Sequence, residues 1–266
     1  MEFFFHYLQL SMLIKYPMKN SHKKKIKKQV ILVTGGSRGI GKEIVKKFVK
    51  SGSKVYFTYK RSIDKELKKI NISKNKNVIP IKCDMSNVNQ LNKIKKILNR
   101  EKKIDILVNN VGDVIKRSSF LNSDDKLWRN AMDINFMSAV RITRIVSKLL
   151  IKSKKGVIVN ISSIASRTGG SGDSLHYAVA KAALNVFTKG LASELKQTRV
   201  VGIAPSAVDT DFQKKHSSKR RLKRIINSTP LGRIGSPDEI AEFVYFVSSS
   251  KASFLSGETI FITGGR

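Results

Sequence analysis

Two side chains that could together transfer a proton lie four residues apart. Tyr177 and Lys181 fall within the segment 174–195, which we predict to be a helix, so both side chains share one helix face. A phenol, with a pKa of about 10, is a weak acid or base at neutral pH unless a nearby cation favours its phenolate. Lys181 would supply that cation. The alternative is an ordinary exposed helix pair, because this spacing often arises by chance.

A serine that follows a buried strand could place a substrate oxygen beside this pair. Ser163 comes just after the apolar run 156–161. In an open parallel sheet, the carboxyl ends of the strands face the ligand crevice. We therefore predict that Ser163 lies at the same site as Tyr177, with Ser162 as the alternative if the register differs by one residue.

A glycine-rich turn after the first predicted strand is typical of a pyrophosphate site. The segment TGGSRGIG at 34–41 connects strand 30–34 to helix 40–50, so backbone N–H groups and the positive end of a helix can face a phosphate. A tight structural turn is the alternative. The residues of this turn that we expect to contact a dinucleotide are Gly35, Ser37, Arg38, Gly39, Ile40 and Gly41.

The end of the second predicted strand favours NADP(H) over NAD(H). An NAD site usually has a carboxylate there for the ribose 2′-hydroxyl, whereas strand 54–59 is followed by Lys60 and Arg61. Together with Arg38, these cations could form charge-assisted hydrogen bonds with a 2′-phosphate. NAD(H) is the alternative cofactor, because lysine is abundant along the whole chain.

The elements that must position these residues alternate along the chain. Short β-branched runs are separated by amphipathic segments such as 40–50 and 87–99, which is typical of βαβ units. We predict one α/β domain over 29–266, a Rossmann-like, doubly wound, seven-stranded parallel sheet with helices on both faces. The expected strands are 30–34, 54–59, 78–82, 104–109, 156–161, 199–204 and 259–263.

Composition excludes several other classes of protein. With one cysteine, Cys83, and four histidines in 266 residues, the chain offers neither an intramolecular disulfide nor a clustered metal site. No apolar run is long enough to span a membrane. The net charge of +33 could indicate a polyanionic partner, but scattered lysines on solvated faces fit compositional drift better, so we expect neither a nucleic-acid nor a membrane partner.

Residues 1–28 differ from the rest of the chain and are expected to be an extension. An apolar segment precedes Pro17 and a lysine-rich stretch, without the charge order of a secretory signal. We expect either disorder or an overcalled start with Met18 as the initiator, and hence a cytoplasmic protein. An organelle-targeting leader is the alternative.

The chain resembles the short-chain dehydrogenase/reductase family, and within it the 3-oxoacyl-[acyl-carrier-protein] reductases, over about residues 29–266. The resemblance rests on an ordered set of motifs: the turn at 34–41, Asp84 after the third strand, NNVG at 109–112 and the closing segment from PLGRIG onward. The family's catalytic tetrad corresponds to Asn135, Ser163, Tyr177 and Lys181.

The resemblance implies a role for each of these residues. Tyr177 would be the acid in carbonyl reduction, Lys181 would lower its pKa and hold the nicotinamide ribose, and Ser163 would polarise the substrate oxygen. Asn135 would hold a proton-relaying water, unless it is simply a satisfied polar residue inside a helix. Further implied cofactor contacts are Asp84 at the adenine, Asn110 and Gly112 at the adenosine ribose, and Val208 and Thr210 at the carboxamide. Asp84 could instead cap the helix 87–99.

Three positions depart from the family pattern. Members of the family usually have asparagine where this chain has Val201, alanine where it has Val111 and glycine where it has Ser206. The hydroxymethyl group of Ser206 would stand near the nicotinamide, which puts cofactor affinity in doubt. Two further interpretations concern packing: Trp128 is expected in a core or an interface, whereas His176 could either pack or line the substrate pocket.

Residues 209–229 interrupt the alternation where the family carries its substrate lid. This segment is basic, which would attract an acyl group on an acyl carrier protein or coenzyme A, although a solvated helix explains it as well. We expect an NADP(H)-dependent 3-oxoacyl thioester reductase without a metal, and the family implies a tetramer. An alcohol, sugar or polyol dehydrogenase and a non-catalytic dinucleotide-binding protein are the alternatives. The lid cations are Lys214, Lys215, Lys219, Arg220, Arg221, Lys223 and Arg224.

Overall fold

The computed structural model describes residues 28–69 and 75–266 of the chain. The prediction of an N-terminal extension therefore falls almost wholly outside the described residues. Within them, no helix is long and apolar enough to cross a membrane.

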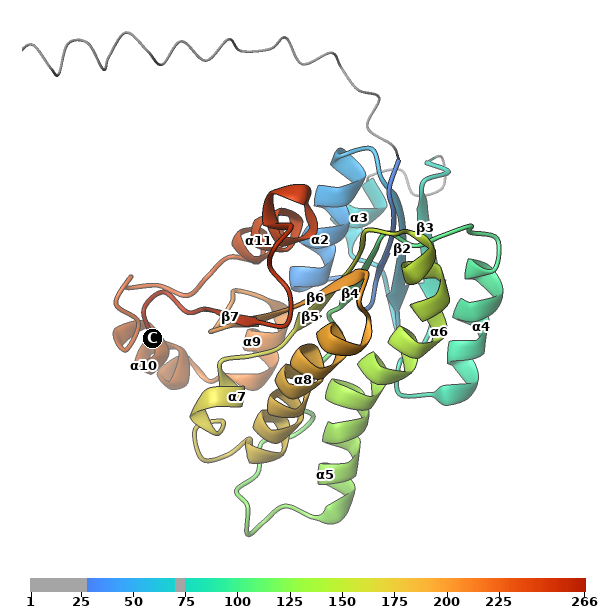
Figure 1. The fold of residues 1–266 in the computed structure, drawn as a ribbon. Helices are drawn as coiled ribbons and strands as arrows, with labels where there is room; N and C mark the ends of the chain where they lie inside the picture. The colour runs from blue at the N-terminus through green and yellow to red at the C-terminus, as the bar shows by residue number, and fades with distance from the viewer. Residues whose placement is uncertain (1–27, 70–74) are drawn as a thin grey trace, which may run out of the picture.

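Seven parallel strands form one sheet in the order β3-β2-β1-β4-β5-β6-β7 (Figure 1). The chain leaves β1 toward one edge and returns beside β1 with β4, so the strand order reverses between these two strands. Ligand crevices in doubly wound folds lie at the carboxyl ends of the strands at such a reversal. The strands are β1 (Val30–Val33), β2 (Lys54–Tyr59), β3 (Val78–Lys82), β4 (Ile106–Asn109), β5 (Gly156–Ile161), β6 (Thr198–Pro205) and β7 (Thr259–Ile262).

The central strands are apolar on both faces because helices cover both sides of the sheet. All four residues of β1, VILV, are buried, as are all six of β5, GVIVNI. Short continuous runs of this kind, rather than alternating ones, identify strands in the middle of a parallel sheet. The predicted fold class is confirmed.

Helices α2 (Gly39–Lys50) and α11 (Pro237–Ser248) cover one face of the sheet. Phe48 of α2 packs within this core beside Tyr245 of α11, with ring centroids 5.4 Å apart. The short helix α3 (Lys65–Lys69) contributes Leu67 to the same core.

Helices α4 (Val88–Leu98), α6 (Ser138–Lys152) and α8 (Leu175–Glu194) lie on the opposite side. Leu91 and Ile94 of α4 and Ile142 of α6 are buried in a second core against the sheet. The other elements are α5 (Asp125–Met132), the π-helical turn η1 (Asp133–Met137), α7 (Ala165–Thr168), α9 (Asp211–His216), α10 (Lys219–Asn227) and the 3-10 turn η2 (Ser250–Ala252).

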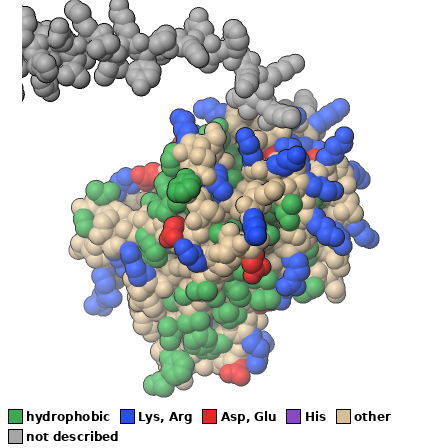
Figure 2. Space-filling model, viewed as in Figure 1, with side chains coloured by type: hydrophobic (Ala, Val, Ile, Leu, Met, Phe, Trp, Pro, Cys, Tyr) green, Lys and Arg blue, Asp and Glu red, His purple; other side chains and the backbone are tan. Residues whose placement is uncertain are grey.

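Side chains of different kinds occupy different parts of the visible surface. Figure 2 shows lysines and arginines spread over the upper and right-hand parts, and hydrophobic side chains gathered in the lower part, where α5 and α8 lie in Figure 1. Val179 and Val186 of α8 and Phe120 before α5 are among the exposed hydrophobic residues. An exposed apolar region of this kind is a candidate surface for association between chains.

Candidate active site

A cleft of about 510 Å³ lies over the carboxyl ends of the strands and continues under α9 and α10. Every residue predicted to contact a cofactor lines this cleft, from Gly35 in the first turn to Thr210 before α9. Ser163, Tyr177 and Lys181 line it too, whereas Asn135 lies behind its wall. The fold thus brings the predicted dinucleotide and catalytic residues to one site.

The turn between β1 and α2 is shaped for close backbone approach. A Cβ on Gly41 would lie 2.2 Å from the carbonyl oxygen of Gly35, so no other residue fits there without displacing the turn. Asn110 braces the same turn, because its Nδ2 donates to the carbonyls of Thr34 and Gly35 at 3.0 and 3.1 Å. A glycine-rich turn that opens a twelve-residue helix fits the pyrophosphate of a dinucleotide.

The cations predicted for the 2′-phosphate, Arg38, Lys60 and Arg61, all line the cleft near the end of β2, but Lys60 forms an ion pair with a carboxylate. Lys60 Nζ lies 2.6 Å from Asp84 Oδ2, while Arg38 and Arg61 have no ion-pair partner within the described ranges. The alternative role of Asp84 as a helix cap is wrong, since the side chain of Asn87 accepts the capping hydrogen bond from Gln90 N at 3.2 Å.

The phenol of Tyr177 is buried against the lid. Its ring centroid lies 6.2 Å from that of Phe212 on α9. Burial raises the pKa of Tyr177 to about 12, and the charge of Asp113 adds to this, while the hydrogen bond with Ser163 and the charge of Arg117 act in the opposite direction. Tyr177 is therefore protonated at neutral pH, as an acid in carbonyl reduction must be.

Lys181 is not among the groups that shift the pKa of Tyr177 in this structure, so the effect predicted for it stays a prediction. Its Nζ donates to the carbonyl oxygen of Ile161 at 2.8 Å and lies 5.8 Å from the centre of the Tyr177 ring. Burial lowers the pKa of Lys181 to about 7, so the amine is only partly charged at neutral pH. The desolvation that raises the pKa of the phenol thus also removes charge from its expected cation.

The two serines after β5 differ in their hydrogen bonds. The Ser162 hydroxyl is buried and donates to the carbonyl oxygen of Lys181 at 3.1 Å. Ser163 Oγ accepts from Ala165 N at 3.1 Å and is the serine that acts on the pKa of Tyr177. Ser163 is accordingly the better placed of the two toward the phenol.

Asn135 lies in the π-helical turn η1 between α5 and α6. Its Nδ2 donates to the carbonyls of Asp113 and Ala131 at 2.8 and 3.0 Å, and its Oδ1 accepts from Asp113 N at 3.0 Å. Gly112 lies between Asn135 and Lys181, because a Cβ there would come within 2.8 Å of Asn135 Oδ1 and 3.0 Å of Lys181 Nζ. Such single π turns are frequent at functional sites.

The departures from the family pattern differ in their surroundings. Val201 is a fully buried core residue of β6. Val111 packs against the glycine-rich turn between β1 and α2: a Cβ added to Gly35 would lie only 3.0 Å from Cγ2 of Val111. Ser206 lines the cleft, and its hydroxyl oxygen is buried without a hydrogen-bond partner in the part of the chain that the structure describes.

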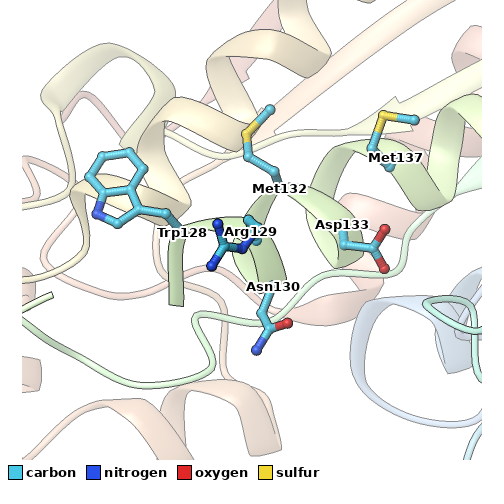
Figure 3. A pocket seen from close by; sticks show the side chains of 6 residues that line it. All are labelled: Trp128, Arg129, Asn130, Met132, Asp133 and Met137. Atoms are coloured by element: carbon cyan, nitrogen blue, oxygen red, sulfur yellow. The ribbon is translucent and has the colours of Figure 1, made fainter. Parts of the chain in front are cut away.

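Two aromatic residues near the site have packing roles. His176 is buried, its Nε2 lies 3.0 Å from the carbonyl oxygen of Val114, and its ring meets the edge of Trp128. Trp128 also lines a second, open pocket on α5 and η1 with Met132 and Met137, away from the cleft (Figure 3). His176 does not line the cleft.

Sequence reasoning missed the charged residues that join the lid to the site. Asp113, Arg117 and Asp173 line or border the cleft and contact α9 or α10. Asp113 directly follows the NNVG motif, which was the only available signal, and its partner His216 lies 103 residues away.

The comparisons with known proteins agree with this geometry. The family described as Enoyl-(Acyl carrier protein) reductase matches residues 35–266. Proteins named 3-oxoacyl-[acyl-carrier-protein] reductase from Buchnera aphidicola (Schizaphis graminum) and Aquifex aeolicus are each 35% identical, over 91% of this chain and 98% of their own. The Synechocystis protein of that name is 33% identical, over 89% of this chain and 96% of its own.

A solved structure shares the fold. The crystal structure of gox2181 superimposes with a TM-score of 0.83 and 26% identity, covering 90% of this chain and 96% of that one. The chain belongs to the short-chain dehydrogenase/reductase family. It is therefore an oxidoreductase, of a class that uses a nicotinamide dinucleotide.

Proposed function

We propose that the protein is an NADP(H)-dependent reductase of 3-oxoacyl thioesters, with Tyr177 as the proton donor. The observation that carries this proposal is the convergence of Ser163, Tyr177 and Lys181 in the cleft that also contains the glycine-rich turn. A non-catalytic dinucleotide-binding role would not require a protonated, buried phenol between a serine and a lysine.

The site residues divide the reaction among them. When bound, the dinucleotide supplies a hydride to the carbonyl carbon of the substrate. Ser163 hydrogen-bonds the carbonyl oxygen, and Tyr177 Oη donates its proton to that oxygen. Lys181 stabilises the resulting phenolate, and Asn135 holds the backbone at Asp113 that forms the adjoining wall.

The cofactor proposal rests on the two arginines that line the ribose end of the cleft. Arg38 and Arg61 could both reach a 2′-phosphate, and the pairing of Lys60 with Asp84 leaves these two as the principal donors. We expect Arg61→Ala to lower kcat/KM for NADPH by about tenfold while kcat/KM for NADH changes little. Lys82→Ala, an exposed lysine at the end of β3, is the control. A wild type that prefers NADH would reject the proposal.

The substrate proposal rests on the relatives' names and on the basic lid. Of the lid cations, Lys215, Arg221 and Arg224 line the cleft, and all seven except Arg221 are exposed to solvent. Such an arrangement suits a thioester carried on an acidic protein or on coenzyme A. We also propose that the reaction takes place in the cytoplasm.

The activity assay is oxidation of NADPH with an acetoacetyl thioester. Tyr177→Phe should lower kcat by about 10²-fold or more. Ser163→Ala should be nearly as damaging, while Ser162→Ala, which loses only the bond to the Lys181 carbonyl, should retain most turnover. Full activity of Tyr177→Phe would rule out the assigned proton donor.

An alcohol, sugar or polyol dehydrogenase is the second candidate, and one observation favours it. Asp113, Arg117 and His216 place polar and charged groups in the same cleft as Tyr177, and such groups suit a polar substrate better than an acyl chain. Turnover of polyols with NADP⁺, without turnover of the thioester, would select this candidate and keep the same tetrad.

We also propose that the protein is a homotetramer. The exposed apolar residues of α8, Val179 and Val186, support one interface, and Phe246 and the fully exposed Phe254 near the C-terminus support another.

A further inference from the structure

The carboxylate of Asp113 ties the lid to the body of the protein. Asp113 Oδ2 accepts from Lys215 Nζ at 2.8 Å, and Oδ1 lies 2.5 Å from His216 Nε2; both partners belong to α9. Burial alone would raise the pKa of Asp113, but the hydrogen bonds from Lys215 and Ile115 N outweigh it and hold that pKa below its usual value. Asp113 is therefore charged at neutral pH.

A second carboxylate, that of Asp173, supports the same lid through Arg117 and Arg221. Asp173 accepts from Arg117 Nη1 at 2.7 Å and from Arg221 Nη1, on α10, at 2.9 Å. Arg117 Nε also donates to the carbonyl oxygen of His216. Both lid helices are thus attached to the loops that lead into the catalytic residues.

The Asp113 contacts place an aromatic ring on the catalytic tyrosine. The His216 ring packs on Phe212 with centroids 4.9 Å apart, and Phe212 in turn packs on Tyr177. The side chain of His216 is only 5% exposed and that of Asp113 is 34% exposed, so water reaches the carboxylate while the rings of His216 and Phe212 shield the buried Tyr177. If α9 moved away, the phenol of Tyr177 would become hydrated.

Asp113 also contacts the catalytic centre through its backbone. Its N–H and carbonyl hold both ends of the Asn135 amide, as described above. The same residue thus fixes Asn135 on one side and the lid on the other. No other described residue makes hydrogen bonds to both Asn135 and the lid.

We propose that Asp113 is a positioning residue, which holds α9 closed over Tyr177 through Lys215 and His216 and couples lid closure to the catalytic centre. This inference rests on the proposed function for its effect on turnover, but not for its effect on the lid. The groups that act on Tyr177 are Ser163, Asp113, Arg117, Lys181 and the ring of Phe212.

The test compares Asp113→Asn with wild type in the full-length protein. The lid contains Lys214, Lys219 and Arg220, so limited trypsin digestion followed by mass spectrometry reports its release without any substrate. We expect cleavage within 211–227 to accelerate about tenfold. Asp125→Asn, which removes an exposed pair with Arg129, is the matched control and should leave this rate unchanged.

The pH profile separates positioning from a purely structural role. Carbonyl reduction needs protonated Tyr177, so its rate falls as pH rises through the pKa of that phenol. Asp113→Asn removes a negative charge and hydrates Tyr177; both changes lower this pKa, so the alkaline limb should move to lower pH. Asp113→Glu, which retains the charge, should restore most of the wild-type profile.

A second variant, His216→Leu, keeps the proposal testable if Asp113→Asn does not fold. His216→Leu keeps the packing on Phe212 and breaks one tether, so it should accelerate lid cleavage with a smaller shift of the alkaline limb. Cleavage at the wild-type rate in both variants would overturn the proposal, as would faster cleavage with an unchanged limb. If no carbonyl compound is reduced, the proteolysis result still decides the tether, and only the proposed function fails.

Discussion

At the residue scale, burial moves the two central groups of the site toward their neutral forms. It raises the pKa of Tyr177 to about 12 and lowers that of Lys181 to about 7. The protein therefore bears the cost of keeping an amine in a site with Ile161 O as its only hydrogen-bond partner among the described residues. Such a cost indicates a functional role, because a hydrophobic side chain would fill the same space at lower free energy.

The first prediction follows from this cost. Lys181→Met should abolish turnover yet raise the free energy of unfolding at pH 7 by on the order of 1 kcal/mol, after the lost bond to Ile161 is counted. Because the folded-state pKa is depressed, the unfolded state binds more protons between pH 7 and about 10, and wild-type stability rises over that range. The gain should thus shrink at pH 9, as measured by urea denaturation. A variant less stable than wild type at pH 7 would contradict it.

The sequence predicted the residues whose chemistry is tied to a local motif. The glycine-rich turn, Ser163, Tyr177 and Lys181, which the fold brings to one cleft, could be selected from the sequence because each lies at a strand end or at helical spacing. The lowered charge of Lys181 and the tether from Asp113 to His216 could not, since both depend on which side chains are buried together. Spacing within one helix says nothing about desolvation by a lid that begins 28 residues after Lys181, at residue 209.

At the scale of elements, two helices in the C-terminal part of the chain have serine N-caps that can be compared directly. Ser236 begins α11 with a capping box, in which its side chain accepts from Glu239 N at 3.2 Å. Ser218 begins the lid helix α10 and accepts from Arg221 N at the same distance. Five residues of α11 are buried, whereas Ile225 is the one buried residue of α10.

The second prediction uses this pair of caps. Ser236→Ala should lower the free energy of unfolding by about 1 kcal/mol, since α11 unfolds only with the sheet that it covers. Ser218→Ala removes the same bond but should change global stability by less than half as much, because α10 can open locally. Thermal unfolding of both variants checks this. Equal losses would show that the lid unfolds together with the core.

Elements with a continuous apolar run were predicted closely from sequence. Strands β2, β3 and β5 have the predicted boundaries, and α4 begins one residue later than predicted because Asn87 is its cap. Helix α5 and the π turn after it were missed. Leu127 and Ala131 are the buried residues of α5, too few for a clear 3.6-residue period, and the extra residue of a π turn has no signature in the pattern.

At the scale of the whole molecule, the apolar surface of α8 bears on assembly. Val186 is 73% exposed, and Phe136 and Phe187 pack edge to face in the same region. The third prediction is that Val186→Lys lowers the oligomeric state, because it places a charge in a face that a second copy would bury. Light scattering after size exclusion measures this. Val88→Lys, on α4 and 55% exposed, is the control, and a monomeric wild type would refute the tetramer.

The charge of the whole molecule leads to the last prediction. A net charge of +33 attracts any acidic partner, but only cations beside the cleft can orient one for reaction. For a thioester on acyl carrier protein, KM should rise several-fold between about 50 and 200 mM salt, since screening shortens the reach of exposed charges to about 10 Å or less. KM for a small neutral thioester should not change.

Charge reversal locates the effect on the molecule. Lys219→Glu with Arg220→Glu, on the lid, should raise KM for the carrier-bound substrate and flatten its salt dependence, because repulsion replaces attraction where the carrier must dock. Lys93→Glu with Lys96→Glu, on α4, changes the net charge by the same amount on another helix. If both pairs act alike, the charge serves only general attraction. If only the lid pair acts, the basic lid is a docking surface for the carrier.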